Sequence, residues 1–355
     1  MEEIACGGCG SDQAMMVLRQ RDLAHTVSDE EFTVVQCRSC GLLYLNPRPN
    51  QTEIGRFYPP QYFSDETPKA RSKLERGLKQ WSNAVKRWIR EDFYGYPGPR
   101  LPRWVKVLRR FLLRPEKARR VFRGREIIPW VGGGRLLDVG CGPGVNLATL
   151  QGQGWEVYGL DTSDVAVERA RAVVGDRVRR GELLDTPYPD GFFDCLLFSH
   201  SLEHMYNLLA VLWEARRILA DHGRLVITLP NAGSFEARLF GRWWFPWELP
   251  RHLYHFEKAT LTHVLARAGF RTERIRTGVG SLYFMASLER VFIHRLGRRL
   301  LARWLIEKLI AKPFCMVAGH LGYGTEITVY AVKAQSWLVN CASDMSVAVS
   351  GLSCG

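Results

Sequence analysis

Short apolar runs alternate with helical stretches over much of the second half of the chain. Four runs have the length of buried parallel strands, at 135–139, 156–160, 194–198 and 224–229. Three stretches between them are predicted to be helices, at 145–153, 164–174 and 203–219. Alternating strands and helices form a parallel sheet, and right-handed crossovers place helices on both of its faces. The pattern therefore predicts a doubly wound α/β domain.

This domain is predicted to span residues 127–335. The segments 269–278 and 325–333 have the composition of two further strands, and a helical insert at 286–312 lies between them. The last residues, 336–355, show no clear periodicity. We expect that tail to be poorly ordered.

The first 50 residues have the pattern of a small metal-binding module. Two C-x-x-C pairs supply four candidate ligands, Cys6, Cys9, Cys37 and Cys40. Strand-like segments at 31–37 and 41–47 flank a glycine turn. Four thiolates suit a tetrahedral zinc ion and leave no open position for a substrate, which predicts a structural zinc ribbon. A pair of disulfides is the alternative, and a reducing cytoplasm disfavours it.

Two features of the sequence indicate the cellular location of the protein. The start, MEEIACGGCG, lacks the basic region and apolar core of a secretory signal. No run of 18 uncharged apolar residues suggests a spanning helix. We expect a cytoplasmic protein, with peripheral contact at the inner membrane face as a further option.

Charge is concentrated in the region that precedes the α/β domain, assigned as a basic helical linker at 51–126. The chain carries a formal net charge of +13, while residues 69–125 hold 19 Lys and Arg against four acids, a net of +15. Such a segment suits an anionic partner, namely a membrane surface, a nucleic acid or a phosphate-bearing substrate. A set of solvated helices is the alternative. The insert at 288–314 is also basic and amphipathic, so it is predicted to lie on an anionic membrane, to cover the acceptor or to be a plain surface helix.

The segment RLLDVGCGPG, 135–144, contains the main chemical signal. A strand ends near Asp138, three glycines follow and a helix begins near Val145. Glycines there allow the backbone to approach a ligand, and the helix offers free N–H groups. A dinucleotide fingerprint would need glycine at 145, and a carboxylate would repel a pyrophosphate but attract an amino group.

Acidic residues follow the next strands. Asp161 comes 19 residues after Gly142, where an acid accepts both ribose hydroxyls. Glu182 can accept from an exocyclic adenine amine. Together with the glycine turn, these residues predict a pocket for an adenosine that bears an amino-acid-like cation and no phosphates.

The motifs LLDVGCGPG, LD at 160–161, PYPDGFFDCLLFSHSLEHM and GRLVITLPN resemble those of the class I S-adenosylmethionine-dependent methyltransferases. The resemblance spans about residues 131–278, with a last strand at 325–333. It implies a Rossmann-like sheet of seven strands with the last one antiparallel, and S-adenosylmethionine as the cofactor. The implied cofactor-binding residues are Asp138, Gly140, Cys141, Gly142, Gly144, Asp161, Thr162, Glu182, Leu183 and Ser199. The cysteine-rich leader and PRHLYHF, 250–256, resemble bacterial methyltransferases found with glycan and secondary-product pathways.

The stretch HSLEHM, 200–205, carries an H-x-x-E-H spacing. On a helix, His200 and His204 would share a face and grip zinc, with Glu203 as the general base of a metalloprotease. Here the motif follows the fourth strand of the predicted domain, so we interpret it as part of the acceptor pocket. A divalent ion shared by the three residues is the alternative.

Methyl transfer to a hydroxyl or a carbon acid needs a base on a loop at the carboxyl ends of the strands. The candidates are His252, His204 and His255, with His252 ranked first because four aromatic residues nearby suggest a water-excluding pocket. Each histidine could instead pack or tie its loop to the core. The predicted reaction is O- or C-methylation of a small-molecule, glycan or lipid-linked acceptor. An RNA methyltransferase is the alternative, although FSHS stands where base-amine methylases carry Asn/Asp-Pro-Pro-Tyr/Phe; a non-catalytic binding module is the third.

Overall fold

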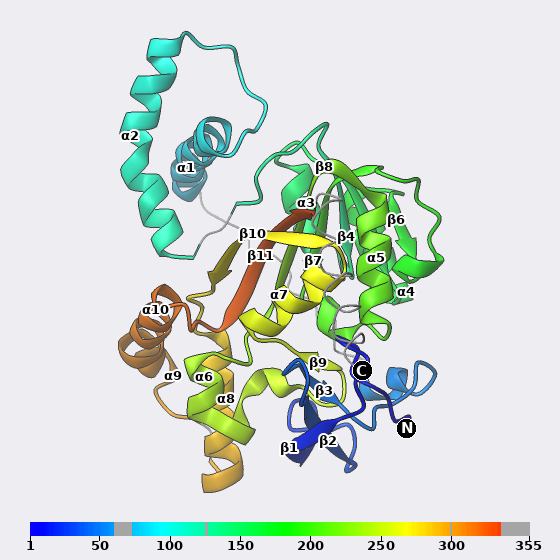
Figure 1. The fold of residues 1–355 in the computed structure, drawn as a ribbon. Helices are drawn as coiled ribbons and strands as arrows, with labels where there is room; N and C mark the ends of the chain where they lie inside the picture. Colours follow the sequence, from blue (N-terminus) through cyan, green and yellow to red (C-terminus); the bar gives the residue numbers. More distant parts are fainter. Residues whose placement is uncertain (60–72, 125–126, 299, 335–355) are drawn as a thin grey trace, which may run out of the picture.

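The computed structural model describes residues 1–59, 73–124, 127–298 and 300–334. The predicted tail at 336–355 lies outside the described residues. Figure 1 shows the central sheet with helices on both sides, a helical hairpin standing apart from it, and the amino-terminal strands below.

The central sheet confirms the doubly wound α/β prediction. Its seven strands are β4 (Arg135–Val139), β5 (Glu156–Asp161), β6 (Val178–Arg180), β7 (Phe193–Ser199), β8 (Leu219–Pro230), β10 (Phe270–Thr277) and β11 (Glu326–Lys333). They lie in the order β10-β11-β8-β7-β4-β5-β6. β11 runs antiparallel to both of its neighbours, while β4 to β8 pair in parallel. The chain leaves β4 in one direction and returns to its other side at β7, so ligands are expected beyond the carboxyl ends of these two strands.

Helices connect the strands and cover the sheet (Figure 1). The main ones are α3 (Val145–Gln151), α4 (Asp164–Val174), α5 (Leu208–Ile218) and α7 (Lys258–Arg267). Shorter turns are η2 (Leu183–Asp185), η3 (Leu202–His204), α6 (Phe235–Phe240), η4 (Gly241–Trp243) and η5 (Phe245–Trp247). The single helix predicted at 203–219 is therefore a 3-10 turn followed, after a break, by α5.

The amino-terminal strands form a second sheet that includes a strand from the α/β region. β1 (Ala14–Arg21), β2 (Glu31–Cys37), β3 (Leu43–Leu45) and β9 (Tyr254–His255) lie in that order. β3 pairs with β9, which joins Leu43 to His255 and Tyr44 to Tyr254. A single apolar core runs from the β2 and β3 side chains into the central sheet. The first 50 residues thus pack as an extension of the α/β domain.

A helical hairpin follows η1 (Ile54–Phe57). It consists of α1 (Lys73–Phe93) and α2 (Arg103–Phe122), separated by the proline-rich turn. Val85, Ile89 and Leu113 form a small core between them. Arg109 of α2 also bridges Asp92, at 2.6 Å, and Glu91, at 3.1 Å. These contacts hold the hairpin together although most of its outer surface faces solvent.

The insert between β10 and β11 is divided into α8 (Leu282–Leu296), α9 (Arg303–Ile306), η6 (Glu307–Ala311) and α10 (Lys312–His320). Gly297 ends α8 in the left-handed conformation, which glycine adopts without steric cost. The insert is consequently bent, and α8 points its first turn at the carboxyl edge of the sheet while α9 and α10 lie further out (Figure 1).

Candidate functional site

The glycine turn between β4 and α3 is shaped by contacts that exclude a side chain. Gly140 has φ +75°, and a Cβ there would lie 2.5 Å from the Cβ of Ser201. Gly144 has φ +83°, and a Cβ there would lie 3.0 Å from the Cα of Ala170. These positions accept only glycine without strain. The turn therefore exposes bare backbone at the carboxyl end of β4.

Asp138, the fourth residue of β4, is buried beneath this turn. Among the described residues neither of its carboxylate oxygens has a hydrogen-bond partner. Burial raises the pKa of Asp138 to about 8, with the nearby Asn146 side chain acting to lower it and the Asp161 carboxylate making a smaller upward contribution. A buried, unpartnered acid is unfavourable unless a donor or a cation pairs with it. The arrangement fits a ligand with a positively charged amino group.

Asp161 ends β5 and holds the turn from the other side. One of its oxygens accepts the backbone N–H of Gly142 at 2.8 Å, and the other accepts that of Ser163 at 2.9 Å. Each carboxylate oxygen has a further lone pair. Asp161 can therefore accept from two vicinal hydroxyls while it fixes the loop.

The residues predicted to face adenine follow β6. Glu182 accepts two hydrogen bonds from the side-chain amide of Gln51, at 2.9 and 3.1 Å, and Leu183 is buried. Gln51 lies 131 residues earlier, so the amino-terminal segment closes one side of the pocket. Sequence patterns gave no signal for this contact.

The remaining predicted cofactor residues differ in how they face the pocket. Cys141 is buried, and its sulfur packs against Gly159 under the turn, so only its backbone is available. Thr162 is exposed next to Asp161, and Ser199 is half-buried at the end of β7. Taken together, the unpartnered Asp138, the bare glycine turn and the free lone pairs of Asp161 fit S-adenosylmethionine.

His200 lies beside this pocket with a left-handed backbone, φ +54°. Its ring nitrogens lie 3.7 Å from Glu203 and 3.4 Å from Glu326, and Tyr283 of α8 is 3.4 Å from Nδ1. Burial alone would lower the pKa of His200, but the two carboxylates outweigh it and raise this pKa to about 10. His200 is thus a cation at neutral pH and cannot accept a proton.

The three histidines predicted as bases differ in access. The His255 ring is buried in β9 against Trp247, at 4.8 Å between ring centroids. The His252 side chain is 7% exposed and its Nδ1 lies 2.8 Å from the Pro246 carbonyl. His204 is only partly buried, and its Nδ1 lies 3.0 Å from the Arg251 carbonyl and 3.2 Å from the Tyr58 hydroxyl. Of the three, His204 has the side chain most accessible to an acceptor.

Burial and the neighbouring His252 lower the pKa of His204 to about 4. Its ring is therefore neutral at physiological pH. With Nδ1 protonated and donating to the Arg251 carbonyl, Nε2 carries the lone pair. This is the protonation state that a general base requires.

Glu203 is buried beside these rings, and neither of its oxygens has a hydrogen-bond partner among the described residues. Glu203, His204 and His252 bring one ligand atom each within 4.8 Å of one another. The set differs from the predicted H-x-x-E-H set because a 3-10 turn, rather than an α-helix, carries Glu203 and His204. His252 takes the place of His200 in this cluster.

The four amino-terminal cysteines form a second cluster. All four sulfurs lie within 4.8 Å of one another, with Cys6 3.6 Å from Cys40 and Cys9 3.4 Å from Cys37. Although burial opposes it, the backbone N–H groups of Cys40 and Ser39 help to lower the pKa of Cys37 to about 6. The distances suit four thiolates around one ion.

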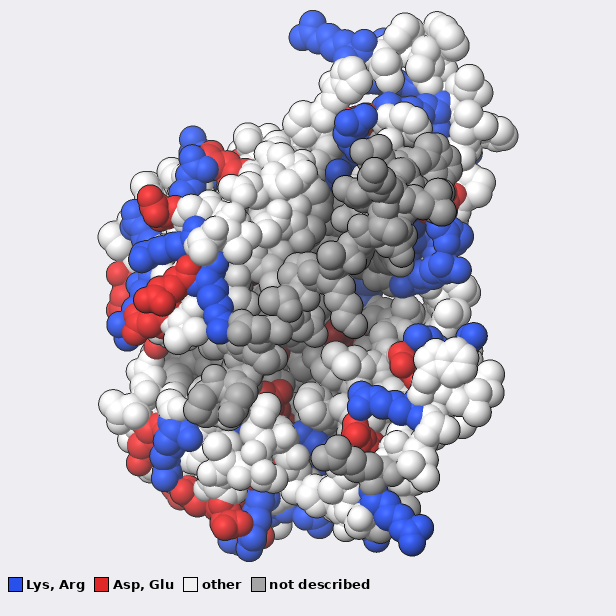
Figure 2. All heavy atoms as spheres, turned by 180° about the vertical axis from the view of Figure 1, so that it is seen from behind, with Lys and Arg blue, Asp and Glu red and all other residues white. Residues whose placement is uncertain are grey.

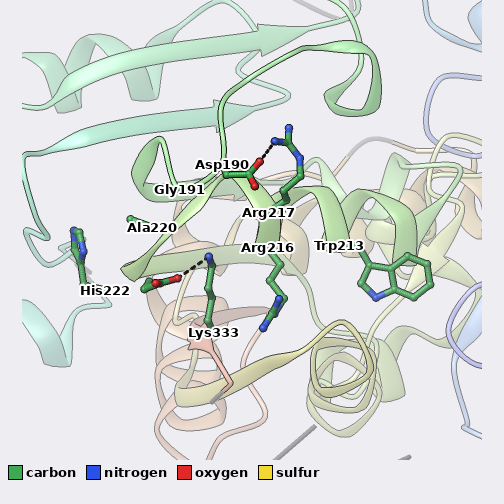
Figure 3. A pocket seen from close by; sticks show the side chains of 9 residues that line it. Asp190, Gly191, Trp213, Arg216, Arg217, Ala220, His222 and Lys333 are labelled. Atoms are coloured by element: carbon green, nitrogen blue, oxygen red, sulfur yellow. Dashed lines mark hydrogen bonds and ion pairs between the residues drawn. The ribbon is translucent and has the colours of Figure 1, made fainter. Parts of the chain in front are cut away.

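An open cavity of about 620 Å³ lies far from these groups (Figure 3). It is found at the amino ends of β7 and β8, the edge of the sheet opposite to the glycine turn. Four of its charged side chains form two ion pairs, Arg217 with Asp190 and Lys333 with Asp221. The chemistry at the carboxyl edge, rather than this cavity, identifies the candidate site.

Several residues at the site gave no sequence signal. They are Gln51, Tyr58, Ser201, Tyr283 and Glu326. Ser201 donates to the carbonyl of Val139 at 2.5 Å and so couples the H-S-L-E-H turn to the glycine turn. The others come from the amino-terminal segment, α8 and β11, which tertiary packing brings to this edge.

Comparison with known proteins gives matches over the same region. Residues 100–275 match the family model of a methyltransferase domain. The chain is 35% identical over 125 residues to a 27-O-demethylrifamycin SV methyltransferase of Amycolatopsis mediterranei, which covers 31% of this chain and 45% of that protein. It is 32% identical over 130 residues to a 2-phytyl-1,4-naphtoquinone methyltransferase of Synechococcus elongatus, covering 32% of this chain and 56% of that protein.

A solved structure of an S-adenosylmethionine-dependent methyltransferase from Mesorhizobium loti covers 61% of this chain and 96% of that one, with 21% identity and a TM-score of 0.41. The chain spans between 32% and 56% of the length of the first curated relatives that it matches.

Proposed function

We propose that this chain, which contains a class I S-adenosylmethionine-dependent methyltransferase domain, methylates an oxygen or a carbon of a small-molecule acceptor. Glycans and lipid-linked compounds are included in this acceptor class. The observation that carries the cofactor is the buried, unpartnered Asp138 beneath the glycine turn at the point where the strand order reverses. The bound cofactor would supply an activated methyl group on a sulfonium. The protein's part is to hold it, align the acceptor and exclude water.

Calorimetric titration with S-adenosylmethionine and with S-adenosylhomocysteine tests this proposal. Saturable binding of both to the full chain is the expected result. A folded chain that binds neither compound would overturn the proposal. A screen of phenols, quinols and sugar nucleotides with a methyl-labelled donor then identifies the acceptor, and transfer to RNA alone would argue against a small-molecule class.

Two relatives support the acceptor class. One is named as a methyltransferase of 27-O-demethylrifamycin SV and another as a methyltransferase of 2-phytyl-1,4-naphtoquinone. The proposed acceptor side of this chain includes half-buried polar groups, His204 and Tyr58, and the ring of Tyr283 lies beside His200 of the same turn. A hydroxylated ring or sugar suits such a surface, because it offers both an apolar face and a proton to remove.

We infer that His204, rather than His252, accepts the acceptor's proton. His204 is the more exposed of the two, is neutral, and is oriented through Nδ1 by a backbone carbonyl. Tyr58 and Glu203 then act as positioning residues around it. This choice differs from the ranking predicted from sequence, which rested on the aromatic residues near His252; in the structure the His252 side chain is 7% exposed.

His204→Gln is expected to lower kcat by about 10² to 10⁴, the usual range for a lost general base, while leaving the affinity for S-adenosylhomocysteine unchanged. Since a base works only when unprotonated and burial holds the His204 pKa at about 4, wild-type kcat should be flat between pH 6 and 8. The exposed His263→Gln on α7 is the matched control and should leave kcat unaltered. An inflection of kcat near pH 6.5, or a fully active His204→Gln, would contradict the assignment.

We propose that Cys6, Cys9, Cys37 and Cys40 hold a structural zinc ion. The support is their mutual distance and the closed set of four sulfurs. Because β3 pairs with β9, an ion at this place would also stabilise the loop that carries His252 and Arg251. The proposed zinc thus supports the catalytic edge without touching it.

Elemental analysis of protein purified without chelator should find about one zinc ion per chain. Cys37→Ser with Cys40→Ser should remove the metal and lower the unfolding temperature. Cys195→Ser, a buried cysteine of β7, should keep the metal. Zinc retained in the double variant, or none in the wild type, would refute the site.

A further inference from the structure

Helix α2 presents an apolar stripe to solvent rather than to the protein. Trp104, Val107, Leu108, Phe111 and Leu112 recur at helical spacing and are between 51% and 70% exposed. Its inner face, through Leu113, already packs on α1. An amphipathic helix normally buries such a stripe, so a large exposed one indicates an interaction surface.

A second apolar surface lies on the insert. Its exposed members are Leu301, Trp304, Leu305, Leu309, Ile310 and Val317, all at least 47% exposed. The ends of α2 and α10 meet where the ring of Phe122 stacks on that of His320, with 4.3 Å between ring centroids. Figure 1 shows α2, α9 and α10 along the same side of the molecule, away from the central sheet.

Basic side chains surround the α2 stripe. The helix carries eight Lys and Arg and one acid, Glu116. Arg103, Lys106, Arg110 and Arg114 pair with no acidic side chain among the described residues. Seen from behind, this edge of the molecule has blue spheres beside white ones (Figure 2). The surface is therefore both apolar and positively charged.

We propose that the outer faces of α2 and of the α9–α10 segment dock the protein on the surface of an anionic lipid bilayer. Exposed Trp, Phe and Leu between cations are the features of helices that lie in the headgroup region. A second copy of the chain would bring two positive faces together, and RNA would leave the aliphatic side chains in water. Among the described residues, no helix is both long enough and apolar enough to cross a bilayer.

Co-sedimentation of the full chain with vesicles tests this. The chain should bind vesicles of phosphatidylcholine with 30% phosphatidylglycerol and bind pure phosphatidylcholine about tenfold more weakly or worse, with salt reducing the difference. Trp104→Glu with Phe111→Glu should weaken binding at least about tenfold, since both side chains lose their apolar contact and add negative charge. Trp213→Glu, at a Trp of α5 that is 55% exposed, is the control and should bind as the wild type does.

Two further measurements keep the outcome clear. Trp304→Glu with Leu309→Glu tests the insert surface independently, and each variant is compared by thermal unfolding and by titration with S-adenosylhomocysteine. Equal vesicle binding by wild type and both double variants would overturn the proposal. The proposal would also be overturned if the wild type bound RNA but no vesicle, or if the wild type were a dimer that these variants dissociate. Because docking does not depend on methyl transfer, its failure leaves the proposed reaction untouched.

Discussion

Asp161→Asn is expected to weaken binding of S-adenosylhomocysteine at least about 100-fold. Asp161 receives the Gly142 N–H at 2.8 Å and the Ser163 N–H at 2.9 Å, so its charge fixes the glycine turn. We propose that the same carboxylate also accepts two ribose hydroxyls. Hydrogen bonds to a charged group are worth about 1.5 to 3 kcal/mol each, and losing two reaches this factor. Titration calorimetry of wild type and variant measures it.

Asp164→Asn is the matched control for this change. Asp164 lies three residues on, in the first turn of α4, where it forms an exposed pair with Arg180. That substitution should leave the affinity within about twofold, because exposed ion pairs contribute little. If Asp161→Asn unfolds at the wild-type temperature and still binds within threefold of wild type, Asp161 is not the ribose ligand.

Most strands of the α/β domain could be predicted nearly to the residue, because their signals are local. β4 has the predicted bounds, and β5, β7, β10 and β11 differ by one residue at one or both ends. β8 begins five residues before its predicted start, and the short strand β6 gave no run from which bounds could be predicted. The glycine turn and Asp161 were equally visible, since glycines followed by a helix and an acid after the next strand form a pattern within 30 residues. Local sequence was therefore enough to predict that the glycine turn and Asp161 follow neighbouring strands at one edge of the sheet.

The acceptor half depends on contacts between distant segments. β9 has two residues, and it becomes a strand because Leu43 lies opposite His255. Nothing within either segment indicates that pairing. His200 matches a metal-ligand spacing, yet Glu326 of β11 and Glu203 make it a cation. The charge state of such a histidine follows from tertiary neighbours and cannot be obtained from spacing.

The H-S-L-E-H stretch shows the same limit. Its spacing favours a helix, but His200 takes a left-handed backbone and Ser201 bonds to Val139 beneath the glycine turn. These contacts direct the chain into a 3-10 turn and place His204 toward Tyr58 and Arg251 instead of alongside His200. The insert differs from a single predicted helix for a local reason, since Gly297 ends α8.

Asp22→Asn is expected to destabilise the fold by about 3 kcal/mol, the lower end of the usual cost of removing one partner of a buried ion pair, because Glu248 remains 3.3 Å from Arg251. Asp22 and Arg251 are both 0% exposed and form two parallel hydrogen bonds of 2.9 and 3.0 Å. Arg251 also donates to the Phe57 carbonyl at 2.7 Å. The pair joins the amino-terminal sheet to the loop that carries His252, so urea unfolding at pH 7 should show the loss.

The effect has a defined pH dependence. Arg251 outweighs the burial that opposes ionisation and lowers the pKa of Asp22 below its ordinary value. A carboxylate with a depressed pKa in the folded state contributes stability above its unfolded pKa, about 3.9, and loses it as pH falls through the folded value. The difference between wild type and Asp22→Asn should therefore be constant from pH 6 to 8 and shrink in acid.

A double variant separates the ion pair from simple damage to the core. Asp22→Asn with Arg251→Met removes both charges, and it should be less destabilised than either single change. Asp29→Asn breaks a pair with Arg21 that is almost fully exposed and should leave the unfolding midpoint unchanged. If the single and double variants lose the same stability, packing rather than the charge pair holds the amino-terminal sheet against the catalytic edge.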